Sequence, residues 1–188
     1  MACRNTCIAS AKKIEMIRQI DNTTNDLEII RTLFREYQDF LQIDLCFQSF
    51  DEELAALPGK YSVDRDGGLY IFEDEGSAGG CVAFYRVDAT TCELKRLYVR
   101  PEFHGKGLGR ALMDRAINDA TEIGYETMIL DTLRRLEGAG KLYQRLGFTE
   151  IEPYNVNPQP DVVYYAKPLN GGSVSSCCSA QNRPDKGG

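Results

Sequence analysis

The sequence lacks tryptophan, holds one histidine among its 188 residues and contains no long apolar run. Without such a run no helix can cross a membrane, and residues 1–13 lack the apolar centre of a signal peptide, so we expect no membrane partner. The single histidine, His104, would leave a zinc site to cysteine and carboxylate ligands, and a serine triad would have to place its base in a glycine loop. Both sites are disfavoured, and we expect no metal cofactor.

Cysteine is scattered rather than patterned. The seven cysteines form no C-x-x-C pair and lie at positions 3, 7, 46, 81, 92, 177 and 178. An odd number without regular spacing is typical of reduced thiols inside a cell, so we expect a cytoplasmic protein. The adjacent Cys177 and Cys178 are better explained as free thiols of a tail than as sites of reversible lipidation.

Basic residues are the minority, with 22 Lys and Arg against 28 Asp and Glu and a formal net charge of −6. An acidic chain does not offer the basic surface that general nucleic-acid binding needs, so we expect no nucleic-acid partner. The length fits one domain with a sizeable core. We place that domain at residues 12–169, after a flexible arm at 1–11 and before a disordered, Gly- and Ser-rich tail at 170–188.

The most informative segment is residues 94–112, LKRLYVRPEFHGKGLGRAL. A strand pattern ends at Pro101, three glycines alternate over 105–109, and a helix pattern follows at once. Glycine lets the backbone approach an anion closely, and the unpaired N–H groups of a first helical turn point at that anion. Residues 93–110 also carry five basic and two acidic residues in an acidic chain. The segment therefore predicts a phosphate-binding loop, although a surface turn with a solvated basic face would share these features.

The glycine spacing separates this loop from the common nucleotide loops. The dinucleotide fingerprint G-x-G-x-x-G fails because Arg110 stands where the third glycine belongs, and no glycine precedes Lys and then Ser or Thr as in the P-loop. The run H-G-K-G-L-G instead resembles the acyl-CoA pyrophosphate loop of the Gcn5-related N-acetyltransferases, Q/R-x-x-G-x-G/A. His104 stands at the Q/R position and is a departure from that pattern.

Two further matches support the resemblance to this GNAT superfamily, which covers about residues 12–169. LYQRLGF at 142–148 is similar to the family signature Y-x-x-x-G-F, and Glu93 precedes the loop where several members keep a catalytic carboxylate. The resemblance implies an α/β (α+β) fold, with a mixed, mostly antiparallel and splayed seven-stranded sheet flanked by about four helices.

The strand and helix patterns agree with that order of elements. We expect a tight turn at 76–79 between the second and third strands. The strands are expected over 13–20, 68–73, 80–87, 92–99, 127–132, 148–153 and 162–167, and the helices over 26–41, 51–57, 107–123 and 138–146.

The resemblance also implies acetyl-CoA as co-substrate, lying in the splayed sheet. The loop N–H groups would hold its pyrophosphate, and an N–H of Tyr98 or Val99 would polarise the thioester carbonyl. Lys106 and Arg110 would either reach the CoA phosphates or, equally, be solvated cations of the loop. The implied cofactor-binding residues are Leu97, Tyr98, Val99, His104, Gly105, Lys106, Gly107, Leu108, Gly109 and Arg110.

Tyr143 and Glu93 are the expected catalytic residues. The resemblance places Tyr143 where it faces the leaving thiolate, and a phenol with a pKa of about 10 is suited to protonate it. The other interpretation of Tyr143 is a core aromatic. Glu93 would take the amine proton through a water molecule, or else attract the cationic acceptor or pair with Lys95 or Arg96, and both interpretations stay open.

The acceptor is expected to be a primary amine of a small molecule or peptide, bound between residues 44–61 and 153–161. The acidic side chains there would attract a cation or simply mark a helix start. The expected aromatic and acidic residues of this pocket are Phe47, Phe50, Tyr61 and Tyr154, and Asp44, Asp51, Glu52 and Glu53. The family's pantetheine-binding Asn is replaced by Leu136, with Asp131 and Thr132 as the nearest polar candidates.

An alternative from a different class is a regulatory acyl-CoA-binding module without turnover. Such a module would need neither Tyr143 nor Glu93, and their presence favours the enzyme. The expected partners are acetyl-CoA and the amine acceptor, and the chain is expected to be a monomer or a homodimer.

Overall fold

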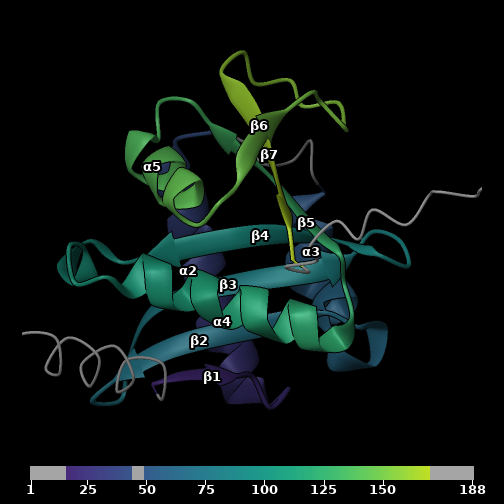
Figure 1. The fold of residues 1–188 in the computed structure, drawn as a ribbon. Helices are drawn as coiled ribbons and strands as arrows, with labels where there is room; N and C mark the ends of the chain where they lie inside the picture. The colour runs from purple at the N-terminus through teal and green to yellow at the C-terminus, as the bar shows by residue number, and fades with distance from the viewer. Residues whose placement is uncertain (1–15, 44–48, 170–188) are drawn as a thin grey trace, which may run out of the picture.

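The computed structural model describes residues 16–43 and 49–169 (Figure 1). The arm predicted at 1–11 and the tail predicted at 170–188 lie outside these ranges. Strands and helices follow the expected order. They are β1 (Ile17–Gln19), α2 (Thr24–Leu41), α3 (Phe50–Ala56), β2 (Gly68–Asp74), β3 (Ser77–Arg86), β4 (Thr91–Val99), α4 (Leu108–Ile123), β5 (Thr127–Leu133), α5 (Glu137–Arg145), β6 (Thr149–Ile151) and β7 (Val162–Pro168). Short 3-10 turns occupy Gly59–Tyr61, Val63–Arg65 and Pro101–Phe103.

The strands form one seven-stranded sheet in the order β1-β2-β3-β4-β5-β7-β6. All neighbours are antiparallel except β4 and β5, which run parallel. These two strands pair only from Thr91–Glu93 on β4 to Thr127–Ile129 on β5, and then diverge (Figure 1). The predicted fold class, a mixed and splayed sheet with four helices, is confirmed.

A β-bulge lies in β4 just beyond the last pair with β5. Cys81 of β3 opposes Tyr98, whereas Ala83 opposes Lys95, so β4 holds one extra residue between these pairs. Arg96 takes up the irregularity with a φ of +58°, in the left-handed region that non-glycine residues rarely adopt. The bulge thus bends β4 at the place where it leaves β5.

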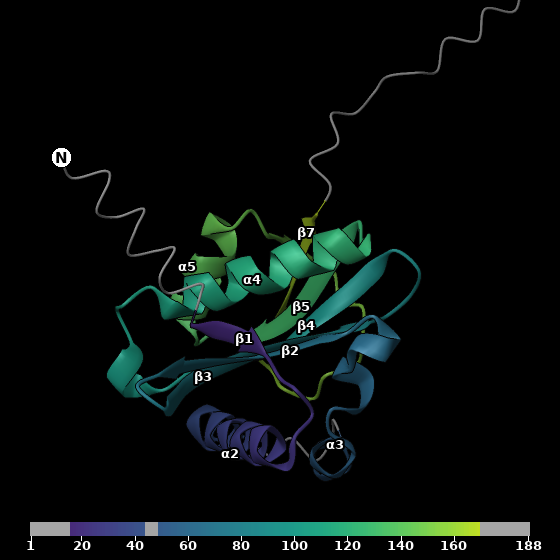
Figure 2. The same cartoon turned by 90° about the horizontal axis from the view of Figure 1, so that it is seen from below.

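Helices cover both faces of the sheet (Figure 2). Helix α4 lies with α5 on one face, and α2 lies with α3 on the other. The inward faces are those that the helical periodicity predicts: Leu112 and Ala116 of α4 are fully buried, as are Leu33 and Phe34 of α2. Each face therefore has its own apolar core, and the splay between β4 and β5 lies between the two.

The turn predicted at 76–79 is wrong in position and in length, because only Gly76 of that range lies in the loop. Strand β3 already begins at Ser77, which pairs with Asp74, so the hairpin loop is only Glu75 and Gly76. Both loop residues have positive φ, at +50° and +79°. A two-residue loop of this kind matches the right-handed twist of the flanking strands, which explains why the turn is tighter than its glycines suggest.

Candidate active site

The largest cavity at the splay, here called the glycine-loop cavity, has a volume of about 840 Å³. It lies between the end of β4, the start of α4 and helix α5. Its lining residues come from four segments of the chain. They are Tyr37, Phe40, Leu97, Val99, Phe103, His104, Gly105, Gly107, Leu108, Gly109, Arg110, Thr132, Arg135, Leu136, Glu137, Gly138, Ala139, Leu142, Tyr143 and Arg145.

The glycine loop presents backbone rather than side chains to this cavity. Gly105 and Gly107 have φ values of +73° and +77°, so both need the conformational freedom of glycine. A Cβ at Gly105 would meet no atom of the described residues within 4 Å. Glycine is therefore needed there for its dihedral angles and not for lack of space. Gly107 caps α4 without a side-chain hydrogen bond, and residues 107–110 all line the cavity, so the first turn of α4 lies where an anion site requires it.

Of the five basic residues that suggested an anion site, three lie elsewhere. Arg100 makes two hydrogen bonds to Glu36 of α2, at 2.8 and 2.7 Å. Lys95 and Arg96 are paired with carboxylates on the far side of the splay. The charge argument from sequence is wrong for these three residues, because side chains of one strand point to both of its faces. Lys106 and Arg110 remain at the loop and are exposed.

The other predicted cofactor residues fall into two groups. The side chains of Leu97 and Val99 line the cavity, and the imidazole Nε2 of His104 lies 2.7 Å from the Val99 carbonyl oxygen, tying the loop to β4. Tyr98 points to the opposite face, where its ring lies 6.1 Å from that of Tyr37. Only the backbone of Tyr98 can therefore take the role proposed for it. Among residues 16–43 and 49–169, no strand pairs with the β4 edge that faces β5 beyond Glu93.

Tyr143 lies where the glycine-loop cavity meets a smaller one. This second cavity, the junction pocket, has a volume of about 40 Å³. Tyr143 lines both, and its ring is held edge-on against Phe148 at 5.9 Å. Burial raises the pKa of the Tyr143 phenol well above its ordinary value. The hydroxyl therefore keeps its proton at neutral pH and can act as a donor.

Leu136 stands at the position of the family's Asn, and Thr132 and Asp131 are the polar candidates to replace that Asn. Leu136 lines the glycine-loop cavity, and Thr132 lines that cavity and the junction pocket. Asp131 is committed to other partners, because its carboxylate accepts from Lys95 at 2.6 Å and from the Asn157 amide at 2.9 Å. Of the two polar candidates, Thr132 is the one that faces the larger cavity.

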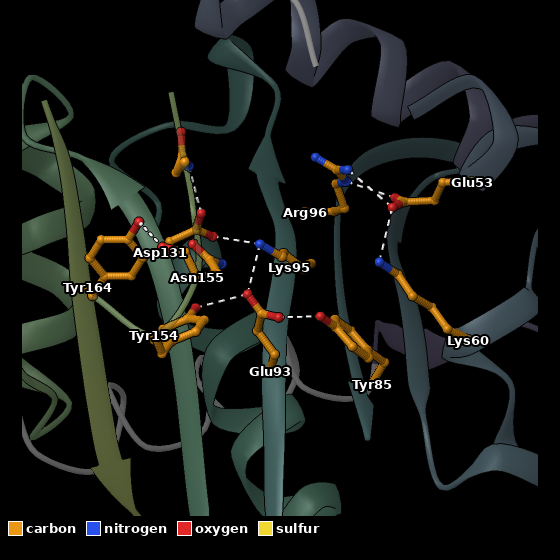
Figure 3. Close-up of polar contacts among 11 residues, drawn as sticks. Glu53, Lys60, Tyr85, Glu93, Lys95, Arg96, Asp131, Tyr154, Asn155 and Tyr164 are labelled. Atoms are coloured by element: carbon orange, nitrogen blue, oxygen red, sulfur yellow. Dashed lines mark hydrogen bonds and ion pairs between the residues drawn. The ribbon is translucent and has the colours of Figure 1, made fainter. Parts of the chain in front are cut away.

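Glu93 is the centre of a buried polar network (Figure 3). Its side chain is almost fully buried, and its carboxylate accepts hydrogen bonds from the phenols of Tyr85 and Tyr154, the latter at 2.8 Å. The Lys95 ammonium lies 2.8 Å from the same carboxylate. Glu93 therefore pairs with Lys95, one of the two interpretations left open by the sequence.

Lys95 and Asp131 join β4 and β5 across the splay. The last backbone pair is Glu93 with Ile129, and one alternation further along each strand stand Lys95 and Asp131, whose charged atoms are 2.6 Å apart. Burial disfavours the charge of Lys95, but the two carboxylates of Asp131 and Glu93 outweigh it and raise the pKa of the ammonium. An ion pair thus continues the contact between the strands after their backbone hydrogen bonds end.

Arg96 and Lys60 share a second carboxylate on the α3 side. The guanidinium of Arg96 bonds both oxygens of Glu53, at 2.8 and 3.1 Å, which holds the bulge residue in its unusual conformation. Lys60 lies 3.3 Å from Glu53 Oε2 and 4.3 Å from the centre of the Tyr85 ring. The meeting of Lys60 and Arg96 at one carboxylate was not predicted, because nothing near Lys60 in the sequence indicates that it lies beside Tyr85 of β3.

A third cavity, the polar pocket, has a volume of about 200 Å³ and opens on this network. Three of its residues, Lys95, Asp131 and Asn157, also line the junction pocket, so the two pockets meet. All its lining residues except Val156 carry polar side chains. They are Lys60, Tyr85, Glu93, Lys95, Asp131, Asn155, Val156 and Asn157.

The aromatic acceptor slot predicted from sequence is wrong for Phe50 and Tyr61. Phe50 and Tyr61 are buried in the core beneath α2, because their rings pack there more favourably than at a surface. Tyr154 does reach the site, through its hydroxyl. Asp51 and Glu52 are exposed in the first turn of α3, as expected of a helix start. Phe47 and Asp44 lie outside the described residues.

Three cavities that meet at a splayed β4–β5 pair, beside a glycine loop and a buried tyrosine, define an acyltransferase architecture. The model of the acetyltransferase (GNAT) family matches residues 28–148. An uncharacterized N-acetyltransferase of Schizosaccharomyces pombe is 42% identical over 140 residues, which cover 74% of this chain and 86% of that one. One of Dictyostelium discoideum is 32% identical over 212 residues, covering 81% and 98%.

The chain belongs to the GNAT family and is an N-acetyltransferase. Among solved structures, an acetyltransferase from Salmonella typhimurium with its cofactor acetyl-CoA has a TM-score of 0.62 at 21% identity, covering 87% of this chain and 99% of that one. Over residues 16–43 and 49–169, no helix combines the length and apolar character needed to cross a membrane. In the same ranges no three His, Cys, Asp or Glu side chains gather as metal ligands would.

Proposed function

We propose that this enzyme transfers an acetyl group directly from acetyl-CoA to a primary amine of a small molecule or peptide. The observation that carries the proposal is Tyr143, which lines both the glycine-loop cavity and the junction pocket. One proton donor thus faces the sites proposed for the thioester and for the acceptor. The fold shared with an acetyltransferase whose structure holds acetyl-CoA agrees with this choice of cofactor.

The glycine loop is proposed to hold the pyrophosphate and β4 to hold the pantetheine. The N–H groups of Gly105 to Arg110 and the helix dipole of α4 would bind the negative charge. The open edge of β4 would pair with the pantetheine amides, with an N–H of Tyr98 or Val99 on the thioester oxygen. Leu97 and Val99 line the same cavity and supply its apolar wall.

The proposed reaction needs two proton movements. The neutral amine nitrogen attacks the thioester carbon, a C–N bond forms, and the carbonyl oxygen becomes an oxyanion. The C–S bond then breaks, the amine nitrogen loses a proton to water, and the CoA thiolate takes the proton of Tyr143, which is restored from solvent. A phenol is protonated at neutral pH, so Tyr143 holds this proton until the thiolate forms.

For Glu93 the contacts favour a positioning role over that of the base. Its carboxylate already accepts from Tyr85, Tyr154 and Lys95, which together fill most of its capacity for hydrogen bonds. Through Tyr154 it fixes the β6–β7 loop against β4. The base role remains a second candidate because Glu93 lines the polar pocket, and the two are separated by the pH profile of a Glu93→Gln variant.

The proposal is tested by thiol release from acetyl-CoA with a panel of amines and N-terminal peptides. Amine-dependent release, together with a rise in melting temperature that CoA produces and NAD or ATP does not, is the expected result. Saturable CoA binding without release for any amine would instead support the regulatory acyl-CoA-binding module.

A further inference from the structure

The two carboxylates that line the polar pocket already bind the protein's own donors. Glu93 accepts from two phenols and Lys95, and Asp131 accepts from Lys95 and Asn157. These carboxylates are buried and already paired, so a further cation would have to displace an existing donor. Glu93, which the sequence suggests as an attractant for a cationic acceptor, therefore serves the protein's own side chains.

Lys60 is the cation of this pocket that remains accessible. Its side chain is 40% exposed, whereas that of Lys95 is 12% exposed. Within the described ranges its paired carboxylate is Glu53, at 3.3 Å, and Glu53 already accepts two shorter bonds from Arg96. The ammonium of Lys60 is thus only partly neutralised, because Lys60 and Arg96 share the one carboxylate of Glu53.

The polar pocket has two distinct ends, one next to Tyr143 and the other at Lys60. Lys95, Asp131 and Asn157 line the end that the polar pocket shares with the junction pocket, next to Tyr143. Lys60 lines the polar pocket but not the junction pocket, and its ammonium lies over the ring of Tyr85. An acceptor with its amine at the Tyr143 end would place its other end at Lys60. Figure 3 shows Lys60 and Asp131 on opposite sides of Lys95.

We infer that the acceptor is a small amino acid whose carboxylate binds Lys60. This inference rests on the proposed acetyl transfer and adds the substrate class. A cavity of about 200 Å³ has room for a molecule of that size. A carboxylate at Lys60 would gain a charge-assisted hydrogen bond that a neutral amine cannot make. The amine end then lies against Lys95 and Asp131, beside the thioester.

The test compares amino acids with their own amides as acceptors, using the glycine/glycinamide and β-alanine/β-alaninamide pairs. The amide has the less basic amine, so chemical reactivity alone favours it. Wild type is expected to prefer the acid by about tenfold or more in kcat/KM, the worth of one charged hydrogen bond. Lys60→Met should abolish the preference through the acceptor KM and leave the acetyl-CoA KM unchanged. Lys60→Arg should keep most of it.

Lys141→Met is the matched control, because Lys141 is exposed on α5 and paired with Glu137, away from the polar pocket. It should keep the wild-type preference, and the melting temperatures of all variants report folding. Equal rates with acid and amide in wild type, or a preference that survives Lys60→Met, would overturn the inference.

Binding is also measured without turnover, by calorimetric titration of β-alanine and β-alaninamide into the CoA-bound protein. Lys60-dependent binding of the acid supports the inference even where no acetyl transfer occurs, in which case only the proposed function fails. Absence of a Lys60-dependent difference in this titration overturns the inference by itself.

Discussion

The two sides of the splayed sheet are built in different ways. The glycine-loop side uses backbone groups of consecutive residues, at the end of β4 and the start of α4. The polar-pocket side uses side chains that come from β3, β4, β5, the β6–β7 loop and the segment after α3. A backbone site depends on a few dihedral angles. A side-chain site of paired charges depends on every partner being present, because a buried charge without a partner is costly.

This difference predicts that the polar-pocket side has the larger effect on stability. Replacing Lys95 with Met leaves the carboxylates of Glu93 and Asp131 without their shared cation. We expect the free energy of unfolding to fall by about 3–5 kcal/mol, as measured by urea denaturation. The exposed control Lys141→Met should change it by no more than about 0.5 kcal/mol. Equal stability of the two variants would show that the ion pairs do not hold the splay.

Tyr143→Phe separates chemistry from binding where the two sides meet. Loss of the proton donor should lower kcat by about 100-fold or more with little change in the acetyl-CoA KM, in a steady-state thiol-release assay. Tyr165→Phe is the matched control, since its ring packs against Tyr143 at 5.9 Å without lining any of the three cavities. A kcat that both variants lower equally would point to packing and not to proton donation.

Gly107→Val tests the backbone side. A β-branched residue at a φ of +77° costs about 1–3 kcal/mol in strain, or it moves the loop N–H groups from the anion. Affinity for CoA should fall by about 5- to 150-fold in a calorimetric titration. Gly124→Val introduces a similar strain at a φ of +107°, at the far end of α4. It should lower stability and leave CoA affinity intact, and a loss of CoA affinity in both variants would argue against a local anion site.

Glu93→Gln should have the smallest effect on rate if Glu93 is a positioning residue. The amide keeps one oxygen that accepts from one phenol, and its NH2 can donate to the other phenol's oxygen. We therefore expect kcat/KM to fall by less than about tenfold with the shape of its pH profile unchanged. If Glu93 is the base, the pH profile itself should change. Loss of the acidic limb of the profile, with a large fall in kcat, would assign Glu93 the proton and reject the positioning role.

The sequence predicted the backbone side well because its signals are local. Gly105 and Gly107 indicate a loop that needs positive φ. Tyr143 belongs to a short signature, four residues before Gly147. The order of the elements followed from periodicity, and the family and fold were confirmed. The position of the turn at Glu75 and Gly76 was missed because a hairpin loop of only two residues lacks the longer cluster of polar residues that usually marks a turn.

The polar-pocket side could not be predicted for a physical reason. Lys60 reaches Glu53 and the Tyr85 ring of β3 only after α3 packs on the sheet, and the bulge at Arg96 decides which side chain turns towards Glu53. Charge counting along β4 assigned Lys95 and Arg96 to the phosphate loop, whereas the strand sends both to the opposite side of the splay. Contacts between distant segments depend on register and bulges, which no local pattern specifies.

The central claim is that Tyr143 stands between a cofactor on the glycine-loop side and an acceptor on the polar-pocket side. A crystal structure of the protein with acetyl-CoA tests it most directly. The account predicts the pyrophosphate on the N–H groups of residues 105–110 and the thioester sulfur within hydrogen-bond distance of the Tyr143 hydroxyl. A pyrophosphate bound elsewhere, or a thioester directed away from Tyr143 and the junction pocket, would contradict it.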